Sequence, residues 1–333
     1  MSTIRSSYFE PRSLSQLLSS ALREATSHSA SGFVTVALIM LPVALLQLVG
    51  AYAVTELGIM ELQEQMQSGQ MTPAQFEPKP MLIFAAFQIV GGVITFVVAY
   101  FAVASVARLF AERAIGKHIG AMGAWDASLR LFFKMLAGSI VQMLVCGAAF
   151  LVLLIPVIAA SAVLSASVGQ EAAGSPGALI QAVAGGLLMI PLVILGTYLC
   201  PMPSVSALED RGAFGTVGRS FGLISGNFGR TFLAILISVV CLAVPMGVLS
   251  WVMNGSALEP LQDSLGDSAG AVVAAIPSAL VFLLVIPLMY SLQALIYFDV
   301  RSRNHEQERF SPADLALDLG EGQPSVAARP RDT

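Results

Sequence analysis

Six long apolar blocks constrain this chain more than any other feature of its sequence. Each holds twenty or more mostly hydrophobic residues between polar flanks, and a helix of that length crosses the roughly 30 Å hydrocarbon core of a bilayer. Transmembrane strands would alternate apolar and polar residues, and Phe150 to Ala160 does not alternate. Charged residues make up 11% of the chain, against about 25% in a soluble domain. We therefore predict an all-α polytopic membrane protein with six transmembrane helices, over about 32–55, 81–106, 133–160, 179–205, 231–254 and 271–298.

The positions of the cations predict the orientation of these spans. Of the 17 Lys and Arg residues, sixteen fall on the side of the predicted spans that holds both termini, and Lys79 alone falls on the other. Because Lys and Arg near span ends are retained in the cytoplasm, we predict a multi-pass protein of the cell (inner) membrane with both termini cytoplasmic. The opposite loops hold acids such as Glu61, Glu64 and Asp263. The net charge of −4 therefore hides a basic inner face and an acidic outer one.

The spans divide the chain into three parts. Residues 1–31 form a cytoplasmic segment with an amphipathic helix, 32–299 form the membrane domain, and 300–333 form a cytoplasmic, largely disordered tail. Within the tail, Ser311 as N-cap, Pro312 at the first helical position and Gly320 as a stop predict one short helix. Ala51-Tyr52-Ala53 resembles a signal-peptidase site, but the long polar start favours an uncleaved span.

An internal repeat organises the membrane domain. At an offset of 89 residues, Arg130 matches Arg219 and Pro156 matches Pro245, and prolines also match between the spans that follow. We predict three units, the first a weaker copy, each made of an interfacial amphipathic helix and a transmembrane hairpin.

The segments that precede the spans of each unit have apolar faces. In the second unit, Trp125, Leu129, Phe132, Phe133 and Leu136 recur at helical spacing, which predicts one apolar stripe lying in the headgroup plane. The alternative is that such helices are cytoplasmic extensions of the spans. The first unit carries a similar face, made of Leu14, Leu17, Leu18, Ala21, Leu22 and Ala25.

The third unit has glycines instead. Gly218, Gly222 and Gly226 recur every fourth residue, and each glycine lowers helix stability by roughly 1 kcal/mol. Close approach of a neighbouring membrane helix compensates such glycines, so we predict a docking face. The alternative is a loosely ordered glycine-rich loop.

Charged residues lie at the inner ends of the last spans. Asp299 and Arg301 directly follow the sixth block as an ionisable pair, and such pairs often bind a neighbouring entry helix. We therefore predict that Asp299 pairs with Arg219 or Arg230. The candidate docking and structural residues are therefore Gly218, Arg219, Gly222, Gly226, Arg230, Asp299 and Arg301.

No enzymatic chemistry is predicted. A charge near the bilayer centre marks a functional site, and no predicted span has a charged residue near its centre. His28, His118 and His305 have no partner at metal-ligand spacing, and motifs for nucleotide binding or serine hydrolysis do not occur. We predict no catalytic or metal-binding residue, no cofactor and no nucleic-acid partner. Gln47 and Gln88 are among the polar span residues, which either hydrogen-bond between helices or line a cargo path.

Three short segments carry a family resemblance: Ala207-Leu-Glu-Asp210, Gly218 to Phe232 with its Arg-Ser-Phe, and Tyr297-Phe-Asp-Val-Arg301-Ser-Arg303. They resemble the glycerophosphoryl diester phosphodiesterase membrane-domain family and related bacterial six-helix inner-membrane proteins. In that family an Arg-Ser-aromatic segment precedes the fifth span and a Tyr-Asp-x-Arg-like segment ends the sixth; here Phe298 replaces a second tyrosine. The resemblance implies a membrane module and transfers no catalytic residue.

These patterns predict a non-enzymatic membrane module. It would act by association of its basic inner face with membrane lipids, with other membrane proteins or with a second copy of itself. The alternative is a permease or transport-associated protein for a lipid or lipophilic solute, whose path would need no charge. Water-accessible labelling at Cys146, Cys200 or Cys241 would favour the permease.

Overall fold

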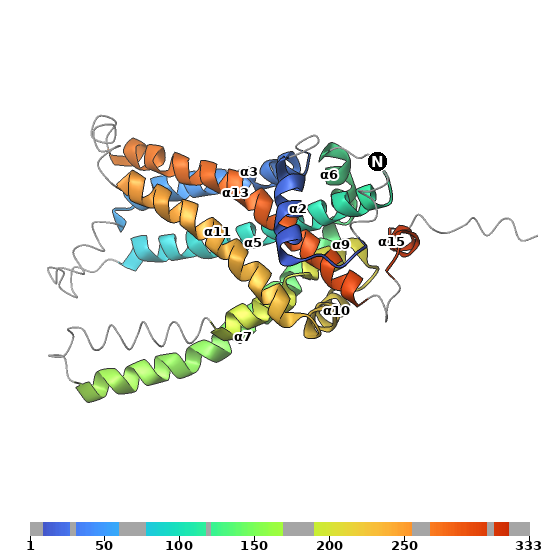
Figure 1. Cartoon of the computed structure of the whole chain (residues 1–333). Coiled ribbons are helices and arrows are strands. Elements are labelled where there is room, and N and C mark those ends of the chain that lie inside the picture. The colour runs from blue at the N-terminus through green and yellow to red at the C-terminus, as the bar shows by residue number, and fades with distance from the viewer. Residues whose placement is uncertain are drawn as a thin grey trace, which may run out of the picture.

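The protein is all-helical in every part that the computed structural model describes (Figure 1). The described residues are 9–26, 31–59, 78–117, 121–168, 190–254, 267–304 and 310–319. The histidines and Gly320 lie outside these ranges, as do the disorder predicted after Gly320 and most of the predicted outer loops. The predicted all-α class is confirmed.

Five long helices form the body of the molecule: α3 (Ser31–Glu56), α5 (Pro78–Ala114), α7 (Phe132–Val168), α11 (Phe228–Asn254) and α13 (Asp267–Arg303). By length and composition, four stretches of the described residues can cross a membrane: Val34–Glu56, Lys79–Ala114, Phe132–Pro156 and Ile190–Leu208. A fifth is added if a bent pair that includes α11 is one span. The predicted sixth block lies in α13, and the number six stays a prediction.

Short helices gather at one end of the long ones (Figure 1). They are α2 (Leu14–Thr26), α6 (Ala121–Arg130), α9 (Met202–Leu208), α10 (Ala213–Ser225) and α15 (Pro312–Asp318). The predicted first amphipathic helix is α2, which packs against α13 and buries Leu17 and Ala21 to 1% exposure each. The predicted tail helix is α15, where the Ser311 hydroxyl accepts a hydrogen bond from the Asp314 amide. We call this end of the molecule the inner end, after the predicted topology.

The second amphipathic segment differs from its prediction. Its helix breaks at Leu131, so that Trp125 and Leu129 belong to α6, while Phe132 and Phe133 begin α7. The Phe132 ring meets Phe101 of α5 at 5.2 Å between centroids, whereas Phe133 is 81% exposed. The prediction of one continuous stripe is wrong, because apolar residues that serve two successive helices can keep helical spacing across the break.

The predicted repeat is not reproduced at this level of detail. At the offset of 89 residues, the break at Leu131 corresponds to Ser220, which lies inside α10. The matching break comes later, at Gly226 and Asn227, where α10 ends and α11 begins. The two helices meet there at 99°. The three-unit arrangement therefore stays a prediction.

Burial is concentrated at the inner end. Along α5, the segment 100–114 is almost entirely buried, whereas no residue of the most apolar window of the same helix is buried. Leu82 and Ile89 are 66% and 68% exposed, while the charged Glu209 and Asp299 are 5% and 4% exposed. A water-soluble protein shows the opposite distribution, because it covers apolar surface first. The protein is therefore membrane-embedded, with lipid covering the apolar helices.

A close contact fixes α7 against α5 at the inner end. The Tyr100 hydroxyl donates to the Ser206 hydroxyl at 2.9 Å and lies 3.4 Å from the Met202 carbonyl oxygen, which joins α5 to α9. A Cβ atom built on Gly138 of α7 would overlap the Tyr100 hydroxyl oxygen. The absence of a side chain at Gly138 therefore allows three helices to meet.

Candidate functional site

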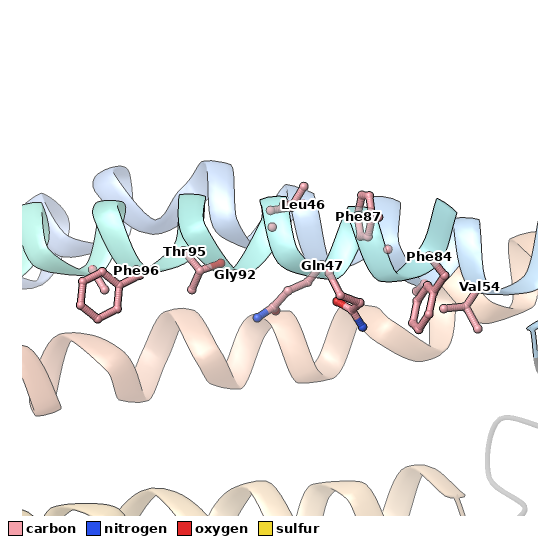
Figure 2. Close-up of a pocket in the computed structure, with 13 residues that line it drawn as sticks. Leu46, Gln47, Val54, Phe84, Phe87, Gly92, Thr95 and Phe96 are labelled. Carbon is pink, nitrogen blue, oxygen red and sulfur yellow. The ribbon is translucent and has the colours of Figure 1, made fainter. Parts of the chain in front are cut away.

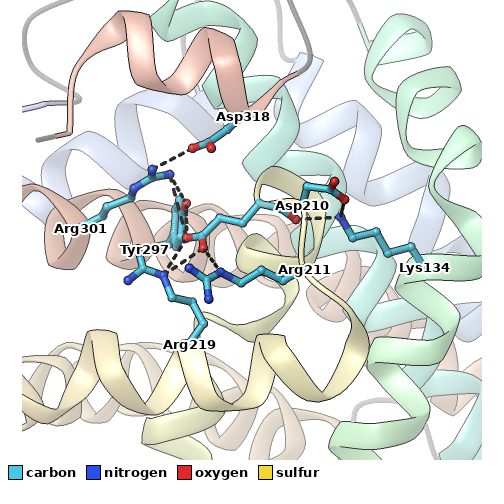
Figure 3. A network of polar contacts seen from close by, with 8 residues as sticks. Lys134, Asp210, Arg211, Arg219, Tyr297, Arg301 and Asp318 are labelled. Carbon is cyan, nitrogen blue, oxygen red and sulfur yellow. Dashed lines mark hydrogen bonds and ion pairs between the residues drawn. The ribbon is translucent and has the colours of Figure 1, made fainter. Parts of the chain in front are cut away.

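A buried carboxylate organises the polar side chains of the inner end (Figure 3). Glu209 follows the last residue of α9, and its extended backbone directs the chain away from that helix. Its carboxylate accepts hydrogen bonds from Arg211 Nε at 2.9 Å, from Arg219 Nε at 2.9 and 3.2 Å, and from the Tyr297 hydroxyl at 3.1 Å. We call Glu209, Arg211, Arg219, Tyr297, Arg301 and Asp318 the Glu209 cluster.

Arg301 connects this cluster to the tail. Its Nη1 donates to the Tyr297 hydroxyl at 2.7 Å, and its Nη2 donates to Asp318 of α15 at 2.7 Å. The guanidinium also lies 4.6 Å from the centre of the Phe310 ring. Burial alone would lower the pKa of Arg301, but its interactions with Tyr297, Asp318 and Glu209 outweigh burial and raise the pKa above its ordinary value. Arg301 therefore stays charged and holds α15 on α13.

Lys134 links α7 to the same place. Its Nζ donates to the Glu209 carbonyl oxygen at 2.7 Å and lies 3.6 Å from Asp210 Oδ1. The segment after α9 is therefore held by side chains from α7, α10 and α13. Glu209 was missed as a site residue from the sequence, although the signal was present: it is an acid directly after an apolar block, on the basic side.

A second buried carboxylate joins the N-terminal segment to the last two long helices. Asp299 Oδ2 accepts from Arg230 Nε at 2.9 Å and from Arg303 Nε at 3.1 Å, and Oδ1 accepts from the Arg12 amide at 2.8 Å. Arg230 and Arg303 also donate to the Arg12 carbonyl oxygen. We call these four residues the Asp299 cluster. The prediction that Asp299 pairs with Arg219 or Arg230 is confirmed for Arg230, and Arg219 lies against Glu209.

Glu112 on α5 is the third buried acid of the inner end. It is 5% exposed and lies 3.1 Å from Arg108 and 3.9 Å from Lys117. Each of these three acids therefore holds at least two cations. Many of the cations that the sequence places on a basic inner face thus stabilise contacts within the chain.

The glycine segment of the third unit is an ordered helix, so the prediction of a loose loop is wrong. Gly218 and Gly222 lie within α10, and Gly226 is its C-cap. Thr216, Ser220, Leu223 and Ile224 are buried on one face of α10. A Cβ atom on Gly218 or Gly222 would meet nothing within 4 Å, and Phe214, four residues before Gly218, is 80% exposed. We call Phe214, Gly215, Gly218 and Gly222 the α10 face. The Arg211 side chain lies 3.6 Å from the position of a Cβ atom on Gly215, and no described residue lies within 4 Å of that position on Gly218 or Gly222.

A groove of about 650 Å³ lies at the other end of the molecule, between α3 and α5 (Figure 2). Its polar lining residues are Gln47, Gln88 and Thr95, and the others are apolar or glycine. The predicted polar span residues Gln47 and Gln88 thus line one space, which the sequence alone did not show.

Comparisons with protein-family models, with curated proteins and with solved structures give no match to this chain. The resemblance to the phosphodiesterase membrane-domain family therefore stays a prediction. Within the described ranges, no three His, Cys, Asp or Glu side chains are grouped so as to hold a metal ion. The ion-pair clusters of the inner end can hold the helices together. The α10 face can contact a partner, and the groove between α3 and α5 can admit a ligand.

Proposed function

We propose that this chain is a non-enzymatic module of the inner cell membrane that acts by association with membrane lipids and with other membrane proteins, a second copy included. In this proposal its six spans form three units and both termini are cytoplasmic, as the cation distribution predicts. The observation that carries the proposal is the uncovered α10 face.

The composition of that face favours a helix as the partner. Gly215, Gly218 and Gly222 each lower the stability of α10 by roughly 1 kcal/mol relative to alanine. At Gly218 and Gly222 no described contact of this chain offsets that loss, because a Cβ atom on either residue would meet open space. In membranes, small residues allow two helix backbones to approach closely, and Phe214 adds an exposed aromatic ring beside them. A partner helix would supply the missing contact.

The cations favour this face over a purely electrostatic association. Arg219 and Arg301 are engaged by Glu209 and Asp318, and Arg230 and Arg303 by Asp299. Their charge is neutralised within the chain, so it contributes less to the attraction of anionic headgroups. Association through the glycines and Phe214 does not need those charges.

A photo-crosslinking amino acid at Phe214 tests the proposal in the full-length protein in native membranes. The matched control position is Phe133, which is 81% exposed and also begins a helix at the inner end. We expect a discrete protein adduct from position 214 and lipid adducts from position 133. An adduct of twice the protein mass would identify a second copy as the partner.

A second pair of variants locates the contact. We expect Gly222→Leu to lower the yield of the Phe214 adduct by about tenfold, equivalent to about 1.4 kcal/mol of association free energy. Gly147→Leu is the control, because a Cβ atom on Gly147 also meets open space but lies on α7. Equal protein adducts from positions 214 and 133, or no effect of Gly222→Leu, would overturn the proposal.

The groove between α3 and α5 favours a second candidate function, a permease or transport-associated protein for a lipid or lipophilic solute. Among the described residues its lining contains no charged side chain, which suits a cargo without charge in the membrane interior.

A further inference from the structure

The exposed side of α10 has a projection at one end and a hollow at the other. Its exposed residues are Phe214, Gly215, Gly218, Gly222 and Ser225. The Phe214 ring is 80% exposed, whereas a Cβ atom on Gly218 or Gly222 would meet nothing within 4 Å. Phe214 and Gly222 each lie four residues from Gly218, so all three lie along one side of the helix. The ring and the hollow are therefore equally far from Gly218, at about 6 Å along the axis.

The axis of α10 runs across the direction of the spans. It meets the axis of the first part of α11, Phe228–Val240, at 99°. In the proposed topology α11 crosses the membrane, so α10 lies close to the membrane plane at the inner end. Figure 1 shows α10 at the lower edge of this end, whereas α15 lies beyond the tips of the long helices. A second protein in the same membrane can therefore approach α10 from the side.

Symmetry restricts how a second copy can meet this helix. In a closed dimer, two copies inserted in the same direction are related by a two-fold axis along the membrane normal. A half turn about that axis reverses the direction of a helix that lies in the membrane plane, so the two α10 helices are antiparallel. With the axis at Gly218, Phe214 of each copy lies at the level of Gly222 of the other. Each exposed ring then fills the hollow of the other copy.

The charges at the ends of α10 fit the same arrangement. Its first turn contains no acidic residue and its last turn no basic one, so the helix does not compensate its own dipole. Arg211, whose side chain is 49% exposed, lies seven residues before Gly218 and therefore at the level of Ser225 of the second copy. Its guanidinium is then beside the carbonyl groups of a helix C-terminus, which favour a cation. The neighbouring Asp210 lies 3.6 Å from Lys134, which offsets its charge.

We propose that the α10 face binds the α10 face of a second copy of this chain. The two helices form an antiparallel pair centred on Gly218, with Phe214 in the hollow at Gly222 and Arg211 at the C-terminal end of the opposite helix. This inference rests on the proposed function, because it names the partner of the same face.

Mapping the adduct of the Phe214 photo-crosslinker tests this arrangement in the full-length protein in native membranes. Trypsin cleaves after Arg219, so positions 214 and 222 fall on different peptides. We expect an adduct of twice the protein mass in which the peptide of position 214 is joined to the peptide of Gly222. Two joined copies of the peptide that holds position 214 would indicate a parallel contact and would overturn the proposal.

This inference and the proposed function fail in different ways. A discrete adduct of position 214 with another protein would overturn the second copy as the partner and would leave the proposed association in place. Lipid adducts alone from position 214 would overturn both.

Exchange of the ring and the hollow tests the fit by co-purification of two differently tagged full-length copies in mild detergent. Gly222→Phe places a second ring against Phe214 of the other copy, and we expect it to lower the yield about tenfold through overpacking. Adding Phe214→Ala to the same chain moves the ring to the other end of the contact and should restore most of the yield. Gly147→Phe on α7, where a Cβ atom also meets open space, should leave the yield unchanged.

The double variant keeps this test informative, because its recovery cannot come from a chain that Gly222→Phe has misfolded. If the double variant is folded, as judged by its thermal unfolding temperature, and still co-purifies no better than Gly222→Phe alone, the fit of ring and hollow is wrong.

Arg211→Gln tests the charge at the helix end. We expect about two- to fivefold less co-purification, the effect of one charge at a helix terminus. Arg211→Lys keeps the charge and should keep most of the yield. Thermal stability is measured for both variants, because Arg211 also binds Glu209. An unchanged yield in folded Arg211→Gln would contradict the antiparallel arrangement.

Discussion

The inner end of this protein and its outer half are stabilised in different ways. At the inner end, Glu209 and Asp299 are nearly inaccessible and each binds at least two cations. In the outer half, large apolar side chains such as Leu82 and Leu151 are more than half exposed. Because lipid tails are as apolar as leucine, no hydrophobic driving force brings helices together there. The comparison indicates that polar contacts and close packing at one end position the helices, while lipid surrounds them at the other.

The strongest test of this comparison is removal of the central charge. Glu209→Gln keeps the shape of the side chain but removes the carboxylate charge that Arg211 and Arg219 share. Breaking a buried ion pair by losing one partner costs about 3–5 kcal/mol, so we expect a strongly lowered thermal unfolding temperature in mild detergent. Asp126→Asn on α6, at an exposed acid, is the control and should change little. Equal shifts for the two variants would show that the cluster does not stabilise the fold.

A leucine truncated at each end sharpens the contrast. Leu208 is 1% exposed at the inner end, and Leu151 is 60% exposed on α7. Leu208→Ala should destabilise the protein by about 2–5 kcal/mol, the usual effect of a buried cavity. Leu151→Ala should stay within about 0.5 kcal/mol, because lipid replaces the lost contacts. The unfolding temperatures of the two variants in detergent measure this difference in stability. Comparable losses of stability in the two variants would contradict lipid coverage of α7.

Two glycines of α7 give the smallest effect. Gly138→Ala introduces a methyl group that overlaps the Tyr100 hydroxyl, which also binds Ser206, and we expect a loss of about 1–3 kcal/mol. Gly147→Ala meets open space and should be neutral or slightly stabilising, because alanine favours the helix. Thermal stability measured side by side decides the matter. A loss at both positions would mean that α7 is packed along its length.

Local sequence signals predicted much of the helical structure. The apolar blocks located the long helices, apolar spacing located α2, and Ser311 with Pro312 located the start of α15. These features depend on residues within one or two turns of each other. The break at Leu131 was not predicted, because apolar residues on both sides of it keep the spacing of one helix.

The candidate site was predicted in part. Asp299 and Arg230 both lie at the inner ends of apolar blocks, and their pairing follows from that shared level. The sequence did not show that Arg219 would bind Glu209 instead, or that Arg303 and the Arg12 amide would share Asp299. Those contacts depend on which helices are neighbours. The sequence places several cations at the same depth, and it does not distinguish among them as partners of a given acid.

The sequence by itself determined that lipid surrounds this protein and where most of its helices lie, because both depend on composition and on the short-range spacing of apolar residues. Tertiary structure decided which acid binds which cation. It also decided that Gly138 packs against Tyr100, whereas Gly218 and Gly222 face open space. It brought Gln47 and Gln88 to the lining of one groove. The physical reason is the short range of these interactions. Ion pairs, hydrogen bonds and steric overlaps act over a few ångströms between residues that are distant in the chain, and only the folded arrangement brings those residues within that distance.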